Sequence, residues 1–327
     1  MQRREFITLL GGAAAAWPLA ARAQQPAMPV VGFLNAASAQ VYTRQLSGFL
    51  KGLSEAGYVD GRNVVIEYRW ADGRSDRLPA MASDLVHRQV AVIAATSTRA
   101  ALAAKASTTT IPIVFEMGAD PVRLGLVTNL NRPGGNITGI TQLTQEVTPK
   151  RLQLLHELLP TATSIALLVN PAEPTSAETQ STVQSAARNL GLELHVLNAS
   201  SETDFDGVFA KLAQLRAGGL VIVGGAFFTN RSEQLGELSL RHAVPAVYVN
   251  RPFAVAGGLL SYGADITDAY RLTGNYTGRI LKGDKPGDLP IQQATTKVEM
   301  YINLKTAKTL GVNIPNTLIG RADEVIE

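Results

Sequence analysis

Apolar and polar positions in the first half of the chain alternate between two periods, one typical of buried strands and one typical of amphipathic helices. A continuous apolar run at residues 30–34 predicts a buried strand. The apolar residues that follow occupy the i, i+3, i+4 and i+7 positions of one helix face: Leu46, Phe49, Leu50 and Leu53. The change of period recurs, with strands predicted at 64–68, 90–94 and 113–115. Strands that alternate with amphipathic helices predict a parallel sheet covered on both faces.

The same alternation begins again in the second half of the chain. Apolar runs predict strands at 165–169, 192–197, 220–223 and 246–249, and helical spacing marks the segments around 183–190 and 205–215. The two runs have comparable lengths. They therefore predict two similar Rossmann-like α/β lobes with parallel sheets rather than one large sheet.

Turn-forming residues suggest where the chain passes between these lobes. Residues 131–136 are rich in Asn, Pro and Gly, and further turn-rich stretches lie near 257–258 and 286–290. We expect crossings at 137–141 and near the two later stretches. Lobe one would then comprise 29–139 plus 262–292, and lobe two 140–261 plus 293–327. Several crossing strands would form a hinge about which the lobes open and close.

The first 23 residues are typical of an export signal. Arg3 and Arg4 precede an apolar segment at 7–19 that is too short to span a bilayer, and Ala21-Arg22-Ala23 supplies a small-x-small cleavage site. The paired arginines favour twin-arginine export of a folded protein, whereas an ordinary secretory signal beginning with two arginines is the alternative. Either pathway predicts a soluble protein in the periplasm.

Charge and cysteine content exclude several classes of partner and of site. The formal net charge is +3, but the signal segment holds Arg3, Arg4 and Arg22 against Glu5, so the remainder is nearly neutral. A nucleic-acid partner is therefore not expected. The chain has no cysteine, which excludes disulfides, thiolate metal sites and a lipid anchor on cysteine.

Several short motifs, in this order, give the chain a resemblance to a known family. They are Val31-Gly32-Phe33-Leu34-Asn35, Asp120-Pro121-Val122, Arg132-Pro133-Gly134-Gly135-Asn136-Ile137-Thr138-Gly139, Ala256-Gly257-Gly258-Leu259-Leu260-Ser261-Tyr262-Gly263 and Ile302-Asn303-Leu304-Lys305-Thr306-Ala307-Lys308. The chain resembles the ABC-transporter substrate-binding proteins of the tryptophan/tyrosine type. That resemblance implies a type I periplasmic-binding-protein fold, binding without chemistry, delivery to an ABC permease in the inner membrane and often an amino-acid-like ligand.

The position of a ligand site follows from the fold class. In open parallel α/β sheets, ligands bind beyond the carboxyl ends of the strands. The loops at those ends, with one segment near a crossing, contain our candidate ligand-binding residues: Asn35, Ser38, Thr96, Ser97, Thr98, Asp120, Pro121, Asn170, Thr175, Phe227, Tyr248, Arg251 and Tyr262. Glu116 and Glu173 are weaker candidates than Asp120 for pairing with an ammonium group of the ligand.

Most of these candidates have a second interpretation. The hydroxyls of residues 96–98 precede an alanine-rich helix, where they would hold a carboxylate, cap the helix, or do both. Asp120, which precedes Pro121, either pairs with an ammonium group of the ligand or forms an ordinary turn. Arg251 either binds an anion in bidentate fashion or makes a surface salt bridge. The aromatic residues, of which Phe227 and Tyr262 are preferred, either stack on an apolar ligand or belong to the core.

Catalytic and metal-binding patterns are not found in the sequence. There is no Gly-x-Ser-x-Gly elbow, no phosphate loop and no dinucleotide fingerprint after the first strand. The four histidines are scattered without metal-ligand spacing. We therefore expect a monomeric receptor without catalytic residues, metal or cofactor, which binds a small carboxylate-bearing molecule such as an amino acid, aromatic ones included. The alternatives are a sensory receptor of the same fold and an exported α/β hydrolase.

Overall fold

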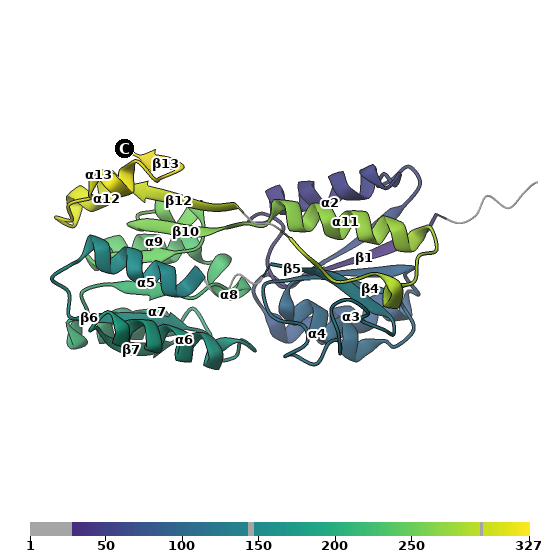
Figure 1. The fold of residues 1–327 in the computed structure, drawn as a ribbon, viewed down its shortest axis with the longest axis horizontal. Coiled ribbons are helices and arrows are strands. Elements are labelled where there is room, and N and C mark those ends of the chain that lie inside the picture. Colours follow the sequence, from purple (N-terminus) through teal and green to yellow (C-terminus); the bar gives the residue numbers. More distant parts are fainter. Residues whose placement is uncertain (1–27, 143–146, 295–296) are drawn as a thin grey trace, which may run out of the picture.

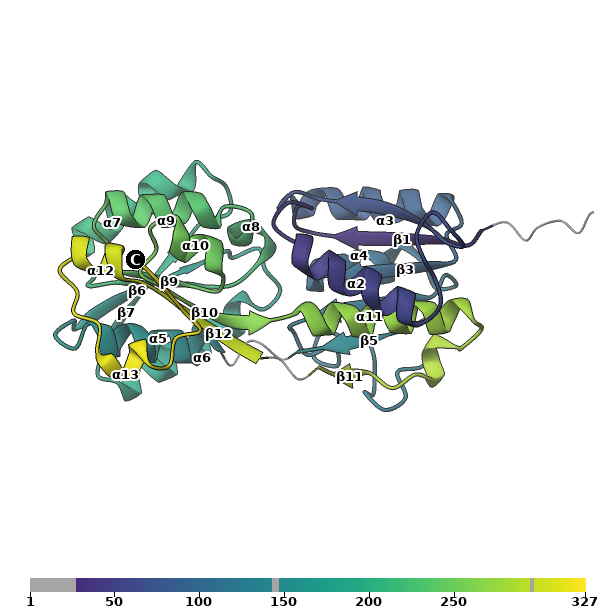
Figure 2. The same ribbon diagram turned by 90° about the horizontal axis from the view of Figure 1, so that it is seen from above.

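The computed structural model describes residues 28–142, 147–294 and 297–327, and these form two α/β lobes side by side along the long axis (Figure 1). The expected signal segment, residues 1–23, lies outside the described residues. Each lobe has a central sheet with helices on both faces, and Figure 2 shows the two sheets separated by the junction between lobes. The expected fold class of two Rossmann-like lobes is confirmed. Among the described residues, no helix is long and apolar enough to cross a membrane.

Lobe one is built on a parallel six-stranded sheet of order β11-β5-β4-β3-β1-β2. Its strands are β1 (Val30–Asn35), β2 (Val65–Trp70), β3 (Val92–Thr96), β4 (Ile113–Met117), β5 (Ile137–Thr141) and β11 (Gln292–Gln293). One face is covered by α3 (Leu78–His87) and α4 (Thr98–Ser107), the other by α2 (Thr43–Glu55) and α11 (Thr267–Leu281). The buried pattern of β1, β3 and β4 fits strands covered on both sides.

Lobe two has a seven-stranded sheet of order β13-β12-β10-β9-β8-β6-β7, in which only β12 runs antiparallel to its neighbour β10. Its strands are β6 (Ser164–Val169), β7 (Glu193–Asn198), β8 (Leu220–Ile222), β9 (Ala246–Tyr248), β10 (Leu260–Asp265), β12 (Lys297–Asn303) and β13 (Glu324–Ile326). Its helices are α5 (Val147–Leu158), α6 (Ser176–Asn189), α7 (Asp204–Leu215), α8 (Ala226–Thr229), α9 (Ser232–Arg241), α10 (Arg251–Val255), α12 (Leu304–Thr309) and α13 (Asn316–Ile319). Separate apolar clusters line the two faces of the sheet.

The chain passes between the lobes after β5, between β10 and α11, and between β11 and β12. Three crossings were expected, but the expected boundaries fall inside strands. Ile140 and Thr141 pair with β4 in lobe one, and residues 262–265 pair with β12 in lobe two. The boundary at 292/293 falls within β11, which pairs with β5. The turn residues that suggested these boundaries lie a few residues away from the crossings because each strand continues past its turn signal to the edge of its lobe.

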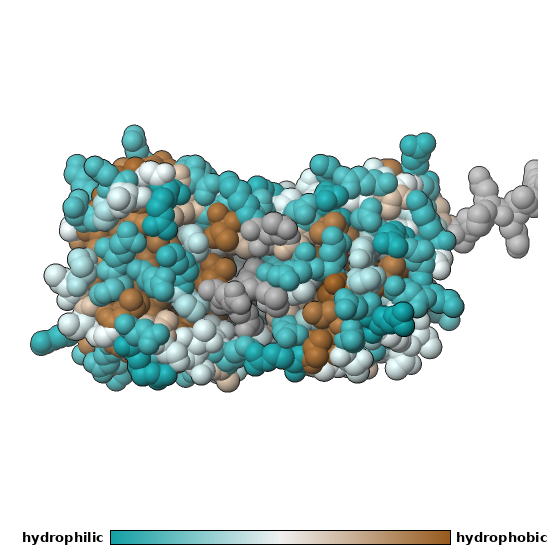
Figure 3. Space-filling view, viewed as in Figure 1, coloured by the Kyte–Doolittle hydropathy of each residue, from teal (hydrophilic) through white to brown (hydrophobic). Residues whose placement is uncertain are grey.

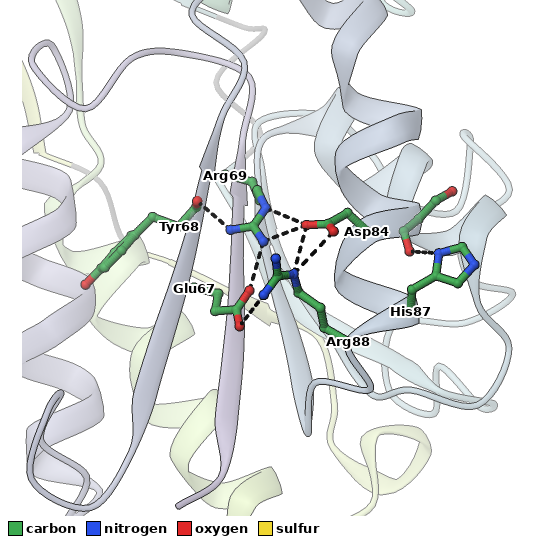
Figure 4. A network of polar contacts seen from close by, with 7 residues as sticks. Glu67, Tyr68, Arg69, Asp84, His87 and Arg88 are labelled. Atoms are coloured by element: carbon green, nitrogen blue, oxygen red, sulfur yellow. Dashed lines mark hydrogen bonds and ion pairs between the residues drawn. The ribbon is translucent and has the colours of Figure 1, made fainter.

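A network of four charged side chains connects β2 to α3 on lobe one (Figure 4). Arg69 donates to Asp84 at 2.6 Å and to Glu67 at 2.8 Å, and Arg88 bonds the same two carboxylates. These hydrogen bonds help to hold the pKa of Asp84 below its usual value. None of the four side chains lines the cavity that lies between the lobes, so we interpret the network as structural.

Candidate functional site

A cavity of about 490 Å³ lies between the lobes, beyond the carboxyl ends of strands from both sheets. Lobe one contributes the ends of β1, β3 and β4 and the start of α4, and lobe two contributes the loops after β6, β8 and β9 together with α5. The strands β10 and β12, which lead into the crossings, line one side. Figure 3 shows the outline of the molecule narrowing between the lobes, on a surface that is largely hydrophilic.

The start of α4 forms part of the lobe-one wall. Ser97 is the N-cap residue, and its hydroxyl accepts a hydrogen bond of 3.2 Å from the backbone N–H of Ala100. Thr98 is the first residue of the helix and also lines the cavity. The first-turn N–H groups of a helix have no partners within it, and the helix dipole favours an anion beside them. This wall therefore offers neutral donors to a negatively charged ligand group.

Asn35 and Thr96 belong to a buried hydrogen-bonded cluster at the same wall. The amide of Asn35 donates to the carbonyl and hydroxyl oxygens of Thr96, both at 2.8 Å, and to the hydroxyl of Tyr270 at 2.9 Å. The Tyr270 hydroxyl in turn donates to the Thr96 carbonyl at 3.0 Å. The cluster therefore fixes the ends of β1 and β3 against α11, and it positions the α4 start.

Glu116 provides an acidic group deep in the cavity. Glu116 is the fourth residue of β4, is only 3% exposed, and accepts a hydrogen bond from the amide of Gln142. Burial raises the pKa of the carboxyl group from 4.5 to about 7, and the hydrogen bond from Gln142 opposes that rise.

Arg151 provides a basic group from the opposite lobe. It lies on the cavity side of α5, is 4% exposed, and donates from Nε to the carbonyl oxygen of Tyr262 at 2.7 Å and from Nη1 to the hydroxyl of Thr148 at 3.1 Å. Burial lowers the pKa of its guanidinium to about 10, so the group remains protonated at neutral pH.

Contacts across the junction hold the two walls together. Arg99 of α4 forms an ion pair of 3.1 Å with Glu173, which follows β6, and Arg123 contacts Glu178 of α6. The backbone N–H of Ser38 donates to Asn230 at 3.1 Å. All of these contacts join lobe one to lobe two, so the structure represents an arrangement in which the lobes are closed on the cavity.

Comparison with known proteins places this geometry in a family. A sequence profile described as ABC transporter substrate binding protein matches residues 31–326. The chain belongs to that family. The resemblance stated from the sequence motifs is therefore confirmed.

The similarity of this substrate-binding protein to known proteins extends over most of the chain. It is 26% identical over 263 residues to a tyrosine-binding protein of Clostridioides difficile, covering 80% of this chain and 75% of the relative. A conserved domain protein from Vibrio cholerae, 26% identical, superposes with a TM-score of 0.83 over 91% of this chain and 99% of the other. An ABC domain from Streptococcus pneumoniae in complex with L-Trp has a TM-score of 0.81 at 24% identity, over the same shares of each chain, and shows a likeness of fold.

Several of the candidates named from the sequence do line the cavity of this substrate-binding protein. They are Asn35, Thr96, Ser97, Thr98, Thr175 and Arg251. The Arg251 guanidinium is nevertheless engaged in a salt bridge, because its Nε and Nη2 donate to the two carboxylate oxygens of Glu324 at 2.7 and 2.6 Å. Of its two interpretations, the structure therefore shows the salt bridge.

The other candidates are not among the cavity-lining residues: Ser38, Asp120, Pro121, Asn170, Phe227, Tyr248 and Tyr262. The Asp120 carboxylate accepts from the N–H groups of the turn that follows it, at 2.8 and 3.3 Å. Asn170 does the same for Ala172 at 3.0 Å. These short polar residues therefore stabilise their own loops instead of facing the cavity.

The three aromatic candidates are packed in the lobe-two core. Phe227 lies beside Phe205 with the guanidinium of Arg231 above its ring at 4.5 Å. Tyr248 is fully buried and its hydroxyl bonds Thr229 at 3.0 Å. Tyr262 packs against the apolar cluster and presents its carbonyl oxygen to Arg151. Of the two interpretations of these aromatic residues, stacking on a ligand and packing in the core, the structure therefore shows packing in the core.

Other cavity residues were missed by sequence reasoning. They include Tyr42, Gln142, Thr148 and Arg151. Tyr42 and Arg151 lie on or next to helices, where the strand-end rule does not look, and Gln142 lies beyond a strand that we interpreted as a crossing. Glu116 was treated as a weak candidate because nothing in the sequence indicates how completely it is buried.

Proposed function

We propose that this protein is the periplasmic solute-binding component of an ABC importer, and that it binds a small carboxylate-bearing molecule in the interlobe cavity. The observation that carries the proposal is that both walls of one closed cavity present groups suited to an anion. The start of α4 faces it from lobe one, and the buried guanidinium of Arg151 faces it from lobe two.

The relatives support an amino acid as the ligand class. The curated relative is a tyrosine-binding protein, and one structural neighbour holds L-Trp. A cavity of about 490 Å³ falls within the usual size range of small-molecule sites. We therefore propose an amino acid or a close relative, aromatic ones included, that binds to a monomeric receptor and is released unchanged to an inner-membrane permease.

A thermal-shift panel on ligand-free protein tests the ligand class. The protein is unfolded in denaturant, dialysed and refolded to remove any bound molecule, and then mixed with amino acids, aromatic acids, sugars and nucleosides. A molecule that binds only the folded state raises the melting temperature by mass action. We expect carboxylate-bearing compounds to give the shifts. Shifts from uncharged sugars or nucleosides alone would contradict the proposal.

Two further measurements test the receptor role and the location. The tight ligand should be recovered chemically unchanged after prolonged incubation, and multiple turnovers seen by mass spectrometry would indicate an enzyme. N-terminal sequencing of the exported protein should begin at Gln24 in the soluble periplasmic fraction. A product that keeps Met1, or that sediments with membranes, would contradict export with cleavage after Ala23.

A further inference from the structure

Glu116 and Arg151 differ from every other acidic or basic side chain that the structure describes. They are the only Asp, Glu, Lys, Arg or His residues in the described ranges that are buried, at 3% and 4% exposed. Both line the same cavity, although they belong to different lobes. A stabilising role in the core would not require the two buried charges to meet at one cavity.

Neither group has a charged partner among the described residues. Glu116 is bonded by the neutral amide of Gln142, and Arg151 donates to one carbonyl and one hydroxyl oxygen. No ion pair within 4.0 Å joins Glu116 to Arg151 or either of them to another described side chain. Burying an ionisable group without a counter-charge disfavours its charged form, so folding stability does not explain why both groups are present.

The hydrogen bonds that the two groups do make serve to orient them. Thr148 lies one helical turn before Arg151 on α5, so its hydroxyl holds the guanidinium from the same helix face. The Tyr262 carbonyl lies on β10, the strand that leads into a crossing between lobes. Gln142 lies at another crossing, directly after β5. Each charged group is thus positioned by a residue of its own wall or of a crossing segment.

We propose that Glu116 binds the ammonium group of the ligand and Arg151 binds its carboxylate, so that a zwitterion supplies the missing counter-charge to each lobe. This assignment rests on the proposed receptor function. The assignment also links the ligand's charges to closure of the lobes. A ligand that carries both charges bonds a buried group on each lobe, whereas a ligand with a single charge bonds and neutralises the buried group of one lobe only. Closure of the lobes therefore selects for zwitterions.

A trio of related compounds tests the assignment by calorimetric titration. L-tryptophan carries both charges, tryptamine lacks the carboxylate, and indole-3-propionate lacks the ammonium group. We expect Glu116→Gln to weaken L-tryptophan at least about 30-fold and to leave indole-3-propionate unchanged or bound more tightly, because truncating one member of a buried charge pair has effects of this size. Arg151→Met should weaken L-tryptophan and indole-3-propionate and spare tryptamine.

Matched controls separate this pattern from a loss of folding. Glu55→Gln and Arg271→Met remove the members of a partly exposed ion pair of 2.8 Å between α2 and α11, outside the cavity lining, and should not change any of the affinities. Arg151→Lys keeps the charge and should restore part of the L-tryptophan affinity lost in Arg151→Met. Circular dichroism establishes that each variant is folded, and the lysine variant is compared with the parent if the methionine variant does not fold.

The possible results lead to different conclusions. An equal loss for all three compounds in either variant would overturn the assignment, because it would indicate a structural role. If another amino acid binds better than tryptophan, its own amine and acid analogues form the trio. If only an uncharged solute binds, the assignment and the proposed carboxylate-bearing ligand both fail, while the solute-binding role stands. If no solute binds the refolded protein, the proposed function itself fails.

Discussion

The buried carboxyl group of Glu116 shows how one residue relates ligand recognition to folding stability. Gln142 bonds it directly. Burial raises the pKa values of the nearby Tyr42 and Tyr270 hydroxyls, and the negative charge of Glu116 raises them further. Its own pKa is about 7 in the folded protein against an ordinary 4.5. The folded protein therefore holds this proton between those pH values while the unfolded chain releases it. The contribution of this group to stability is complete below pH 4.5 and falls as the pH rises to 7.

Glu116→Gln should therefore stabilise the ligand-free protein at alkaline pH, since glutamine cannot ionise. From the pKa difference, the free energy of unfolding should rise by up to about 3 kcal/mol at pH 8, and it should not rise at pH 4.5. Urea denaturation at both pH values measures this. Glu55→Gln, on the exposed side of α2, is the control and should not reproduce the gain. A pH-independent effect of Glu116→Gln would show that burial of the charge is not its cause.

Ser97 and Thr98 are adjacent but should have separable roles. The Ser97 hydroxyl caps α4, so Ser97→Ala should lower stability by about 1 kcal/mol. Thr98 lines the cavity without serving as the cap, so Thr98→Ala should leave the melting temperature of the free protein nearly unchanged. If the Thr98 hydroxyl bonds the ligand carboxylate, its loss should weaken binding about tenfold or more. Titration and thermal melts on both variants check this, and parental affinity in Thr98→Ala would exclude the contact.

At the scale of elements, the start of α4 and the loop after β6 form a contact between the lobes. Arg99 and Glu173 are 24% and 17% exposed, so their ion pair is partly screened by solvent. Arg99→Met should raise the dissociation rate of the ligand about 2- to 5-fold, as expected for the loss of such a pair, and leave the association rate nearly unchanged. Stopped-flow measurement on Arg99→Met, Glu173→Gln and the double variant tests this.

The double variant provides the critical comparison for this ion pair. If the two side chains act through each other, the double variant should dissociate no faster than the singles. Arg279→Met removes a similar pair with Asp284, on lobe one outside the cavity lining, and should leave the rate unchanged. Additive effects of Arg99→Met and Glu173→Gln would indicate that each residue touches the ligand independently.

Which elements could be predicted depended on where their apolar residues lie. The apolar runs of β1, β3, β4 and β6 are buried apart from the partly buried Val30, so composition alone revealed them. Helix α11 was missed because its buried residues are largely small or polar, among them Thr273, Gly274 and Thr277. A Cβ on Gly274 would lie 2.0 Å from the carbonyl oxygen of Phe49, so α11 and α2 approach at a point that only glycine permits. Periodicity of large apolar residues does not detect such packing.

The candidate site was predictable only where it depends on topology. The strand-end rule located the α4 start and Asn35 because parallel strands place their carboxyl ends at one edge. The rule does not report which direction a side chain takes in a loop, so Asp120 and Asn170 were chosen although each bonds its own turn. Arg151 could not have been found in this way, since an arginine within a helix is ordinarily exposed, whereas here it is buried and bonds the Tyr262 carbonyl of β10, a strand distant in the sequence.

At the scale of the whole molecule, three crossing segments allow the lobes to rotate while each sheet stays intact. Each lobe has its own apolar clusters, so opening does not require the core to be disrupted. Several interlobe contacts are polar: Arg99–Glu173, Arg123–Glu178 and Ser38–Asn230 can all be exchanged for water. The apolar contact across the junction is small, with Ala226 of lobe two packed against a lobe-one cluster. Such an interface favours an equilibrium between open and closed states that a ligand shifts through its preference for the closed one.

Saturation with ligand should therefore reduce the radius of gyration measured by small-angle scattering. The physical reason is that a ligand bonded to Glu116 on one lobe and Arg151 on the other has more contacts when the lobes are closed. Because the chain contains no cysteine, Lys51→Cys and Lys305→Cys, at exposed sites on α2 and α12, allow specific dye labelling and an independent distance measurement by energy transfer. Arg151→Met at equal occupancy should close less completely than the parent. An unchanged radius and unchanged transfer efficiency, in ligand-free protein shown to begin open, would contradict closure.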